Sequence, residues 1–251
     1  NIPSVFITHQ LLVKTNLGNT VDEYLQKINY SFINKFTECW VPDHAGINNL
    51  AGELSHPAKL PAIPTTYIGP LSRFENHTNS KEKYLLILLS GPEPQRTLLE
   101  ELLIEQLKSY KEAVVLVRGL PGEENIPVVP SNVEVINHLP AIQLNEKILD
   151  AWMVIARCGY STVMDLSILG KKSILIPTPG QTEQEYLSRH LMQTNFALCI
   201  EQQKFKLVPA LGLALNFPYR FHSHQGSGLE GAVSGFLKVV GERNAQTTNG
   251  F

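Results

Sequence analysis

The chain has 251 residues, of which 43% are hydrophobic and 18% charged, a composition typical of a globular protein rather than a disordered or fibrous one. Its 21 Lys and Arg against 23 Asp and Glu give a formal net charge of −2, so it lacks the positive field that attracts nucleic-acid backbones. The longest apolar run near the middle, Tyr84–Leu89, falls far short of the ~20 residues of a membrane span. We therefore expect no nucleic-acid partner and no transmembrane segment.

Three cysteines, Cys39, Cys158 and Cys199, are odd in number and scattered along the sequence. Their spacing fits neither a disulfide framework nor a metal knuckle, and it suits a reducing compartment.

The chain begins with Asn1 rather than Met, and Ile2–Ile7 already resembles the approach to a buried strand. No signal-peptide pattern precedes it. We interpret the sequence as a fragment of a longer protein.

Strand-like and helix-like runs alternate along the chain, the pattern of an α/β protein with parallel sheets covered by helices. In the first part we predict strands at Val5–Thr8 and Cys39–Val41, with a helix at Val21–Phe36 between them. The stretch Asp43–Pro70 is rich in proline and glycine and lacks periodicity, so it is predicted as loop or linker. Residues 1–70 are thus predicted to be the end of a partial Rossmann-like domain plus its linker.

After Lys83 the alternation becomes clearer. The predicted strands are Tyr84–Leu89, Ala113–Arg118, Val133–Ile136, Trp152–Ala156, Ser173–Ile176 and Ala197–Ile200. The predicted helices are Gln95–Lys108, Asn145–Ala151, Thr162–Leu169 (ended by Gly170), Thr182–Thr194 and Leu229–Val240. Residues 71–251 are therefore predicted to form one doubly wound parallel sheet, whose ligands bind at the carboxyl ends of the strands.

The loop Ser90–Arg96 leaves a buried strand and opens a helix, whose free amides and dipole favour an anion. Gly91 permits close backbone approach, while Ser90 and Arg96 offer a hydroxyl and a guanidinium. However, Glu93 has the wrong sign beside a phosphate, and the loop has no P-loop or Gly-x-Gly-x-x-Gly spacing. Taken alone, a proline-capped helix start with a solvated arginine explains this loop better.

A second loop, Arg157–Thr162, also joins a strand to a helix. Gly159 lets a phosphate approach, and Ser161 offers a hydroxyl and a helix N-terminal amide. One turn further, Asp165 is placed to accept hydrogen bonds from a ribose diol. An equally good explanation is that Thr162 and Asp165 form a capping box that satisfies local backbone donors.

The third loop, Pro177–Tyr186, carries Gln181 and Gln184, whose neutral amides suit sugar hydroxyls. Thr182 and Glu185 fit a capping box, so a structural role for Glu185 stays open. Three such loops at neighbouring strand ends indicate a site more strongly than any one of them.

At these loops the sequence resembles the donor-binding half of GT-B glycosyltransferases, nearest to the MurG-like enzymes that transfer N-acetylglucosamine from a UDP-sugar to a lipid-linked acceptor. The most specific match runs from Arg157 to Tyr186: Arg157–Asp165 resembles the family's Arg-Ser-Gly-Ala-x-Thr motif with its acidic residue, and Glu183–Tyr186 its Gln-Gln pair. Weaker matches are Ser90–Arg96 with the glycine-rich phosphate loop, Asn137–Leu139 with the uracil-contacting backbone, Tyr67–Pro70 with the Gly-Asn-Pro interdomain entry, and Thr8–Gln10 with a His-Glu-Gln turn.

The resemblance implies a nucleotide-sugar donor, with roles for matching residues. The ribose would be held by Asp165, the diphosphate by Ser90, Gly91 and Arg96 or by the amides of Ser161 and Thr162, and the sugar by Gln184 and Glu185. His138 and Leu139 would lie beside the uracil base, and Arg157, Gly159 and Gln181 complete the implied donor-binding set. Because helix N-termini and Arg neutralise the leaving diphosphate, no metal and no cofactor besides the UDP-sugar substrate are implied, and no Asp-x-Asp occurs.

The sequence departs from the family's pattern on both the donor and the acceptor side. Asp165 replaces a longer Glu, Ser188 replaces an Asn, and Pro92–Pro94 replaces a more open turn. The upstream βα units, with the family's His base, have no counterpart, so the catalytic base is unknown, and His9 is a weak candidate because a lone His after a strand is more often structural. The fragment is expected to bind donor without turnover. The acceptor is unknown, and the family implies a lipid-linked one, with a cytoplasmic location and peripheral membrane contact through upstream residues.

Two other functions stay open: a non-catalytic nucleotide-sugar-binding subunit of a two-chain transferase, and a sugar-nucleotide epimerase of the same fold. The upstream coding sequence would distinguish them. A metal site at His222 and His224 is not expected, because no Cys, Asp or Glu stands at ligand spacing from this pair.

Overall fold

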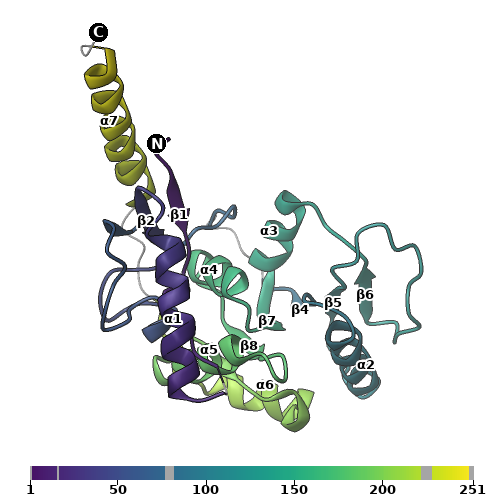
Figure 1. Ribbon diagram of the computed structural model, residues 1–251. Coiled ribbons are helices and arrows are strands. Elements are labelled where there is room, and N and C mark those ends of the chain that lie inside the picture. Colours follow the sequence, from purple (N-terminus) through teal and green to yellow (C-terminus); the bar gives the residue numbers. More distant parts are fainter. Residues whose placement is uncertain (1, 16, 77–81, 222–227, 249–251) are drawn as a thin grey trace. The chain divides into compact units, whose positions relative to one another are not determined.

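A computed structural model describes residues 2–15, 17–76, 82–221 and 228–248, with side chains described as far as residue 241. The chain divides into two compact units, one made of Asn1–Leu71 with Ser223–Phe251 and the other of Ser72–His222 (Figure 1). Each unit is built on a parallel sheet, which confirms the predicted α/β class.

The first unit has a three-stranded parallel sheet in the order β1-β2-β3, formed by β1 (Val5–Ile7), β2 (Glu38–Val41) and β3 (Thr65–Tyr67). Helix α1 (Asn19–Ile33) connects the first two strands, and the 3-10 turn η1 (Gly52–Leu54) lies before the third. Its buried cluster includes Leu11, Ile33, Cys39 and Val41. Strand β3 was not predicted, because the prolines around it mask a segment that adds only three residues to the sheet edge.

Helix α7 (Gly228–Thr248) belongs to the first unit by its contacts, whereas the sequence placed it in the second domain. Phe236 packs edge-to-face on Trp40, with ring centroids 6.1 Å apart. A Cβ built on Gly228 would lie 3.2 Å from the carbonyl oxygen of Tyr67, so the start of α7 approaches β3 closely.

The second unit has a six-stranded, wholly parallel sheet in the order β6-β5-β4-β7-β8-β9. Its strands are β4 (Tyr84–Leu88), β5 (Val114–Val117), β6 (Val133–Ile136), β7 (Ala151–Arg157), β8 (Ser173–Ile176) and β9 (Leu198–Cys199). Its helices are α2 (Gln95–Leu107), α3 (Ala141–Leu149), α4 (Tyr160–Leu169), α5 (Thr182–Gln193) and α6 (Leu207–Leu215), with the 3-10 turn η2 (Gln202–Lys204). This sheet confirms the predicted doubly wound architecture.

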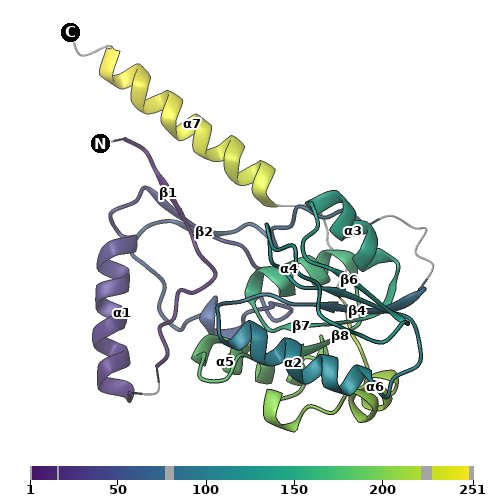
Figure 2. The ribbon, with the colours of Figure 1, turned by 90° about the vertical axis from the view of Figure 1, so that its right-hand side faces the viewer.

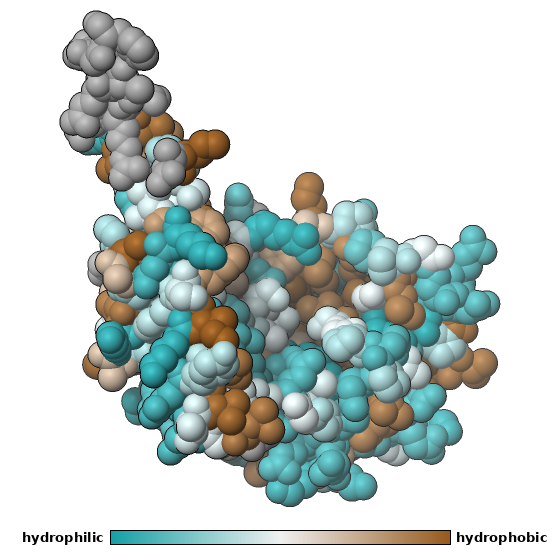
Figure 3. Space-filling view, viewed as in Figure 1, coloured by the Kyte–Doolittle hydropathy of each residue, from teal (hydrophilic) through white to brown (hydrophobic). Residues whose placement is uncertain are grey.

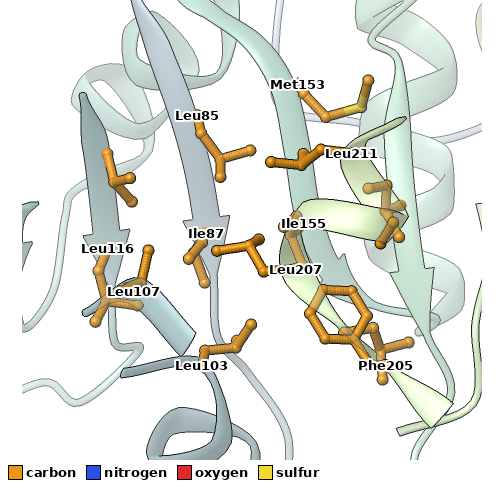
Figure 4. Close-up of a cluster of buried hydrophobic side chains, with 14 of the residues drawn as sticks. Leu85, Ile87, Leu103, Leu107, Leu116, Met153, Ile155, Phe205, Leu207 and Leu211 are labelled. Atoms are coloured by element: carbon orange, nitrogen blue, oxygen red, sulfur yellow. The ribbon is translucent and has the colours of Figure 1, made fainter. Parts of the chain in front are cut away.

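Side chains alternate between the two faces of the second sheet. Leu85, Ile87 and Ile155 point toward α2 and α6, where they meet Leu103 and Leu211 (Figure 4). Helices α3 and α4 lie on the opposite side of the strands (Figure 2). The strands are apolar along most of their length because both faces are covered.

Helix α6 was missed because Pro209 and Gly212 resemble helix breakers. Pro209 is the third residue of the helix, in the first turn, where a backbone N–H has no partner within the helix and its loss costs nothing. Helix α3 starts at Ala141, four residues before its predicted start, directly after Pro140. Gly170 ends α4 in the left-handed conformation (φ 60°), as predicted.

The chain reverses its direction of travel across the sheet at β4. From β4 it proceeds outward through β5 to β6, then returns to β7 on the other side of β4 and proceeds through β8 to β9. The loops that leave β4 and β7 therefore cross to opposite faces. Such a switch point opens a crevice at the carboxyl ends of the two strands, which is where ligands bind in folds of this type.

Lys171 ties α3 to the start of β7. Its buried ammonium donates hydrogen bonds to the carbonyl oxygens of Leu149 at 2.6 Å and Ala151 at 2.8 Å. We predict that Lys171→Met lowers the free energy of unfolding by about 1–3 kcal/mol, because both buried carbonyls lose a charged donor. Urea denaturation measures this loss, with the exposed neighbour Lys172→Met as control. Equal stability of the two variants would contradict the anchoring role.

Candidate active site at the carboxyl ends of the strands

A cavity of about 310 Å³ lies at the switch point. The residues that line it come from the segment before β4, the ends of β4 and β5, the loop after β6, and helices α3 and α4. They are Arg73, Phe74, Leu88, Leu89, Ser90, Val117, Gly119, Pro121, His138, Leu139, Leu144, Ile148, Ser161, Thr162, Asp165 and Leu166. Of the predicted donor-binding residues, this cavity brings together Ser90, His138, Leu139, Ser161, Thr162 and Asp165.

The cavity has an apolar part and a polar part. Leu139 together with Leu144 and Ile148 of α3 forms an apolar wall, and Figure 3 shows hydrophobic colour gathered in the hollow beside that helix. Ser161, Thr162 and Asp165 form the polar side on α4. An apolar wall beside a few polar groups is the usual composition of a small-molecule site.

A larger cavity, about 660 Å³, opens at the opposite edge of the sheet, near the amino ends of β4, β5 and β7. Trp152, Leu211 and Leu215 make much of its wall, and none of the predicted site residues lies there. The lining residues and the sheet topology therefore favour the smaller cavity as the candidate ligand site.

Asp165 is the acidic group of the smaller cavity. Its Oδ1 accepts a hydrogen bond of 2.6 Å from the hydroxyl of Ser72. Burial raises the pKa of the Asp165 carboxyl, and the Ser72 hydrogen bond and the positive charge of Arg73 only partly offset this. The alternative that Asp165 belongs to a capping box is wrong, because α4 begins at Tyr160 and no side chain caps its start.

Ser72 and Arg73 were missed by sequence reasoning. Ser72 lies 93 residues before Asp165 in the chain, with strands β4 to β7 between them, yet its hydroxyl donates to the Asp165 carboxylate and Arg73 lines the same cavity. The resembling segment Tyr67–Pro70 ends just before them, and it was the one signal that could have pointed to this pair.

Two features present backbone amides to the cavity. Gly159 caps α4 with extended backbone, so the first-turn amides, including those of Ser161 and Thr162, have no partner within the helix. Ser90 follows β4 and precedes Gly91, whose φ of 101° gives a sharp turn that L-residues avoid. Both arrangements suit an anion.

Gly119, which the sequence analysis did not select, sets the distance between the loops after β4 and β5. Its φ is 70°, and a Cβ built on it would lie 2.5 Å from the carbonyl oxygen of Leu89. No side chain fits there without moving the end of β4, so a glycine is required.

Arg96 does not face the cavity. Its guanidinium, 5% exposed, is hydrogen-bonded to Glu93 at 2.5 Å, to Glu100 at 3.0 Å and to Thr97 at 2.6 Å. The solvated arginine expected from the sequence is therefore wrong, because Arg96 is buried in ion pairs. Its predicted role on a diphosphate would require breaking them.

Glu100 also pairs with Arg118 at the end of β5, through Arg118 Nε and, at 3.2 Å, Nη2. Arg118 Nη1 donates hydrogen bonds to the side-chain oxygen of Asn137 at 2.8 Å and to the carbonyl oxygen of Asn125 at 2.7 Å. This network connects α2 to the loops that follow β5 and β6. Those loops contribute Pro121 and His138 to the cavity wall.

Arg157 lies at the end of β7 and is 2% exposed, so it does not line the cavity either. Its Nη2 donates to the carbonyl oxygen of Gln95 at 2.5 Å, and its Nη1 to that of Pro177 at 3.4 Å. Burial lowers the pKa of the guanidinium to about 10. The side chain thus connects the start of α2 to the segment after β8.

The third predicted loop holds itself together with its own side chains. Gln184 Nε2 donates to Gln181 Oε1 at 2.6 Å, and Gln184 Oε1 accepts from the amide of Thr178 at 2.9 Å. Glu185 accepts a bond of 2.9 Å from the amide of Gly180, so it satisfies a local backbone donor as the structural alternative required, although Gln181 rather than Thr182 is the N-cap. None of Gln181, Gln184 and Glu185 lines the switch-point cavity.

His9, the weak acceptor-side candidate, is half-buried in the first unit. His222 and His224 lie outside the described residues. Within the described ranges, no group of three or more His, Cys, Asp or Glu is arranged to hold a metal ion. In that same part of the chain, no helix combines the length and apolar character needed to cross a bilayer.

Comparison with known proteins identifies the family of the chain. The model of the glycosyltransferase family 28 C-terminal domain matches residues 93–219, just over half of the chain. The chain therefore belongs to this family.

A curated relative is the UDP-N-acetylglucosamine--N-acetylmuramyl-(pentapeptide) pyrophosphoryl-undecaprenol N-acetylglucosamine transferase of Desulforamulus reducens, 27% identical over 180 residues, with 63% of this chain and 48% of that protein covered. Among solved structures, the MurG of Acinetobacter baumannii aligns with a TM-score of 0.53 at 15% identity, over 86% of this chain and 58% of that one. The glycotransferase of kitacinnamycin aligns with a TM-score of 0.53 at 17% identity, over 77% and 51%. These structures confirm the GT-B fold, and the chain spans about half the length of the curated relative.

The Glu100 network yields a stability prediction. Glu100→Gln leaves Arg96 and Arg118 buried without their shared carboxylate, which is expected to cost about 3–5 kcal/mol of unfolding free energy. Urea denaturation checks this, with Glu101→Gln on the exposed face of the same helix as control. If Glu100→Gln is as stable as Glu101→Gln, the ion pairs do not hold these loops.

The raised pKa of Asp165 predicts how stability depends on pH. Above that pKa the carboxylate is charged in both states, and burial penalises only the folded state, so Asp165 lowers stability at neutral pH. The penalty disappears as pH falls toward the unfolded value. Asp165→Asn should therefore be more stable than the wild type at pH 7, with the gap closing by pH 4, as measured by urea midpoints at both values. A gap that widens on acidification would contradict the raised pKa.

Proposed function

We propose that this chain forms the donor-binding half of a glycosyltransferase that moves a sugar from a UDP-linked donor to an acceptor hydroxyl. The observation that carries the proposal is the cavity itself, in which an apolar wall, a buried carboxylate and the N-terminus of a helix converge at the switch point. Family membership supports the reaction class.

Each part of such a donor has a matching region of the cavity in this proposal. The uracil ring of the donor fits against the apolar wall of Leu139, Leu144 and Ile148, and the backbone of His138 and Leu139 lies at the edge of the ring. The ribose diol donates to Asp165, whose carboxylate Ser72 orients. The diphosphate accepts from the amides at Ser161 and Thr162 and from the turn at Ser90, with Arg73 supplying positive charge in place of Arg96.

The sugar lies beyond the diphosphate in this proposal, toward Gln181, Gln184 and Glu185, whose bonds to one another and to their own loop would exchange for bonds to sugar hydroxyls. The sequence supplies no assignable catalytic base, and we propose that the catalytic base and the acceptor surface come from outside this chain. A lipid-linked acceptor and a cytoplasmic, membrane-peripheral setting follow from the resemblance to the MurG-like enzymes and are part of the proposal.

Donor binding is tested directly by calorimetry with UDP. We expect the wild type to bind UDP and Asp165→Ala to bind about 10- to 100-fold more weakly, because the ribose loses hydrogen bonds to a charged acceptor worth ~1.5–3 kcal/mol. Ser72→Ala should lower the affinity less, since it removes only the orienting hydroxyl.

The control is Glu146→Ala, which removes an exposed carboxylate from α3 outside the cavity. An unchanged affinity in Asp165→Ala would remove that residue from the site. Absence of UDP binding by the wild type would overturn the proposal for the nucleotide. Sugar transfer by the chain alone would show that it needs no further residues for catalysis.

A further inference from the structure

Arg157 differs from the other buried arginines in having no counter-ion. Arg96 and Arg118 share the carboxylate of Glu100. Arg157 is more deeply buried than either, at 2% exposure, yet its hydrogen bonds go only to the neutral carbonyls of Gln95 and Pro177. Within the described ranges, no Asp or Glu pairs with it, and its Nε is buried without a hydrogen-bond partner.

An unpaired buried cation is costly, because the protein interior replaces water poorly as its solvent. Desolvation, with no opposing charge, is what lowers the pKa of Arg157 to about 10, so the guanidinium stays charged at neutral pH but at a cost. Natural proteins rarely leave such a group without a compensating ion, so each case needs an explanation.

The position of Arg157 indicates what compensates it. It ends β7, two residues before the N-cap of α4, and its Nη2 holds the first residue of α2. The positive ends of α2 and α4 and this guanidinium therefore converge on one side of the switch point. Nearby, Oε1 of Gln95 and Oγ1 of Thr178 are also buried without partners, so the polar groups around Arg157 are incompletely satisfied in the protein alone.

We propose that Arg157 is a positioning residue that supplies a buried positive charge for the diphosphate of the donor, without touching it. This inference rests on the proposed function and goes beyond it by giving the role to a residue outside the cavity wall. The guanidinium fixes the start of α2 to the segment after β8, and its charge lowers the energy of the bound diphosphate through the low-dielectric interior between them.

The experiment compares three probes by calorimetry: UDP, uridine and inorganic pyrophosphate. In Arg157→Met we expect UDP and pyrophosphate to bind at least 10-fold more weakly and uridine to change less than 2-fold, because only the first two carry the charge. Arg157→Lys keeps the positive charge but lacks the branched guanidinium that reaches both carbonyls. It should therefore recover at least half of the pyrophosphate binding free energy that Arg157→Met loses. Arg220→Met, an exposed arginine outside the cavity, is the control.

Stabilisation by ligand gives a second readout. Arg157→Met removes the desolvation cost of the cation together with its hydrogen bonds to the carbonyls of Gln95 and Pro177, so stability without ligand does not separate the two roles. Saturating UDP should raise the urea midpoint of Arg157→Met less than it raises that of the wild type. A merely structural clamp predicts a parallel loss of UDP and uridine binding, and that result overturns the proposal. If Arg157→Met does not fold, Arg157→Lys and Arg157→Gln are compared instead, and equal pyrophosphate binding by these two would overturn it.

The outcomes separate this inference from the proposed function. UDP binding that is insensitive to every Arg157 variant rejects the role of Arg157 and leaves the donor site in place. Pyrophosphate binding that depends on Arg157, in a chain that binds neither uridine nor UDP, rejects the UDP donor and retains the buried charge. A wild type that binds none of the three probes rejects both.

Discussion

The pairing of β4 with β7 is the constraint on which the site depends. Because these strands are parallel neighbours while their continuations cross to opposite faces, no connection covers their carboxyl ends. The loops after them have to diverge, and the space between them becomes the cavity. Gly119 shows how tight this arrangement is, since the loop after β5 lies against the carbonyl of Leu89 with no room for a side chain.

Electrostatics then separates the residues whose charges are balanced by partners within the protein from those whose charges are not. Glu100 satisfies two arginines and through Arg118 holds the loops that carry Pro121 and His138. That network is complete within the protein. Asp165 and Arg157 are not: one is a carboxylate whose burial raises its pKa, and the other a guanidinium whose burial lowers its pKa. Both shifts mean that the charged form is poorly solvated where it stands.

The parts of the fold that periodicity controls were predictable. Strands such as Val133–Ile136 and Ser173–Ile176 agree with the predicted bounds because short, mostly apolar segments between turn residues have few alternatives. Strand β3 and helix α6 were not predictable in this way, since prolines and glycines occupy positions that only the finished structure makes harmless. The site residues likewise divide into those that the sequence predicted and those that it did not. Motifs adjacent to strand ends located Asp165 and Ser161, whereas Ser72, Arg73 and Gly119 depend on contacts between distant segments that no local pattern records.

Arg96 illustrates why residue type and position were insufficient. A guanidinium in the first turn of α2 looks the same in sequence whether it faces a ligand or a carboxylate, and the difference is made by Glu100, one helical turn later on the same face. Arg157 is the converse case, because no carboxylate reaches it within the described part of the chain. Two charges of opposite sign, Asp165 and Arg157, therefore carry desolvation costs that the protein does not repay internally. Hydroxyl donors from a ribose would solvate the first, and a diphosphate anion would balance the second. Under the proposed function, a single nucleoside diphosphate would meet both demands, and we expect a ligand that carries the two groups together to stabilise the folded chain more than either group alone.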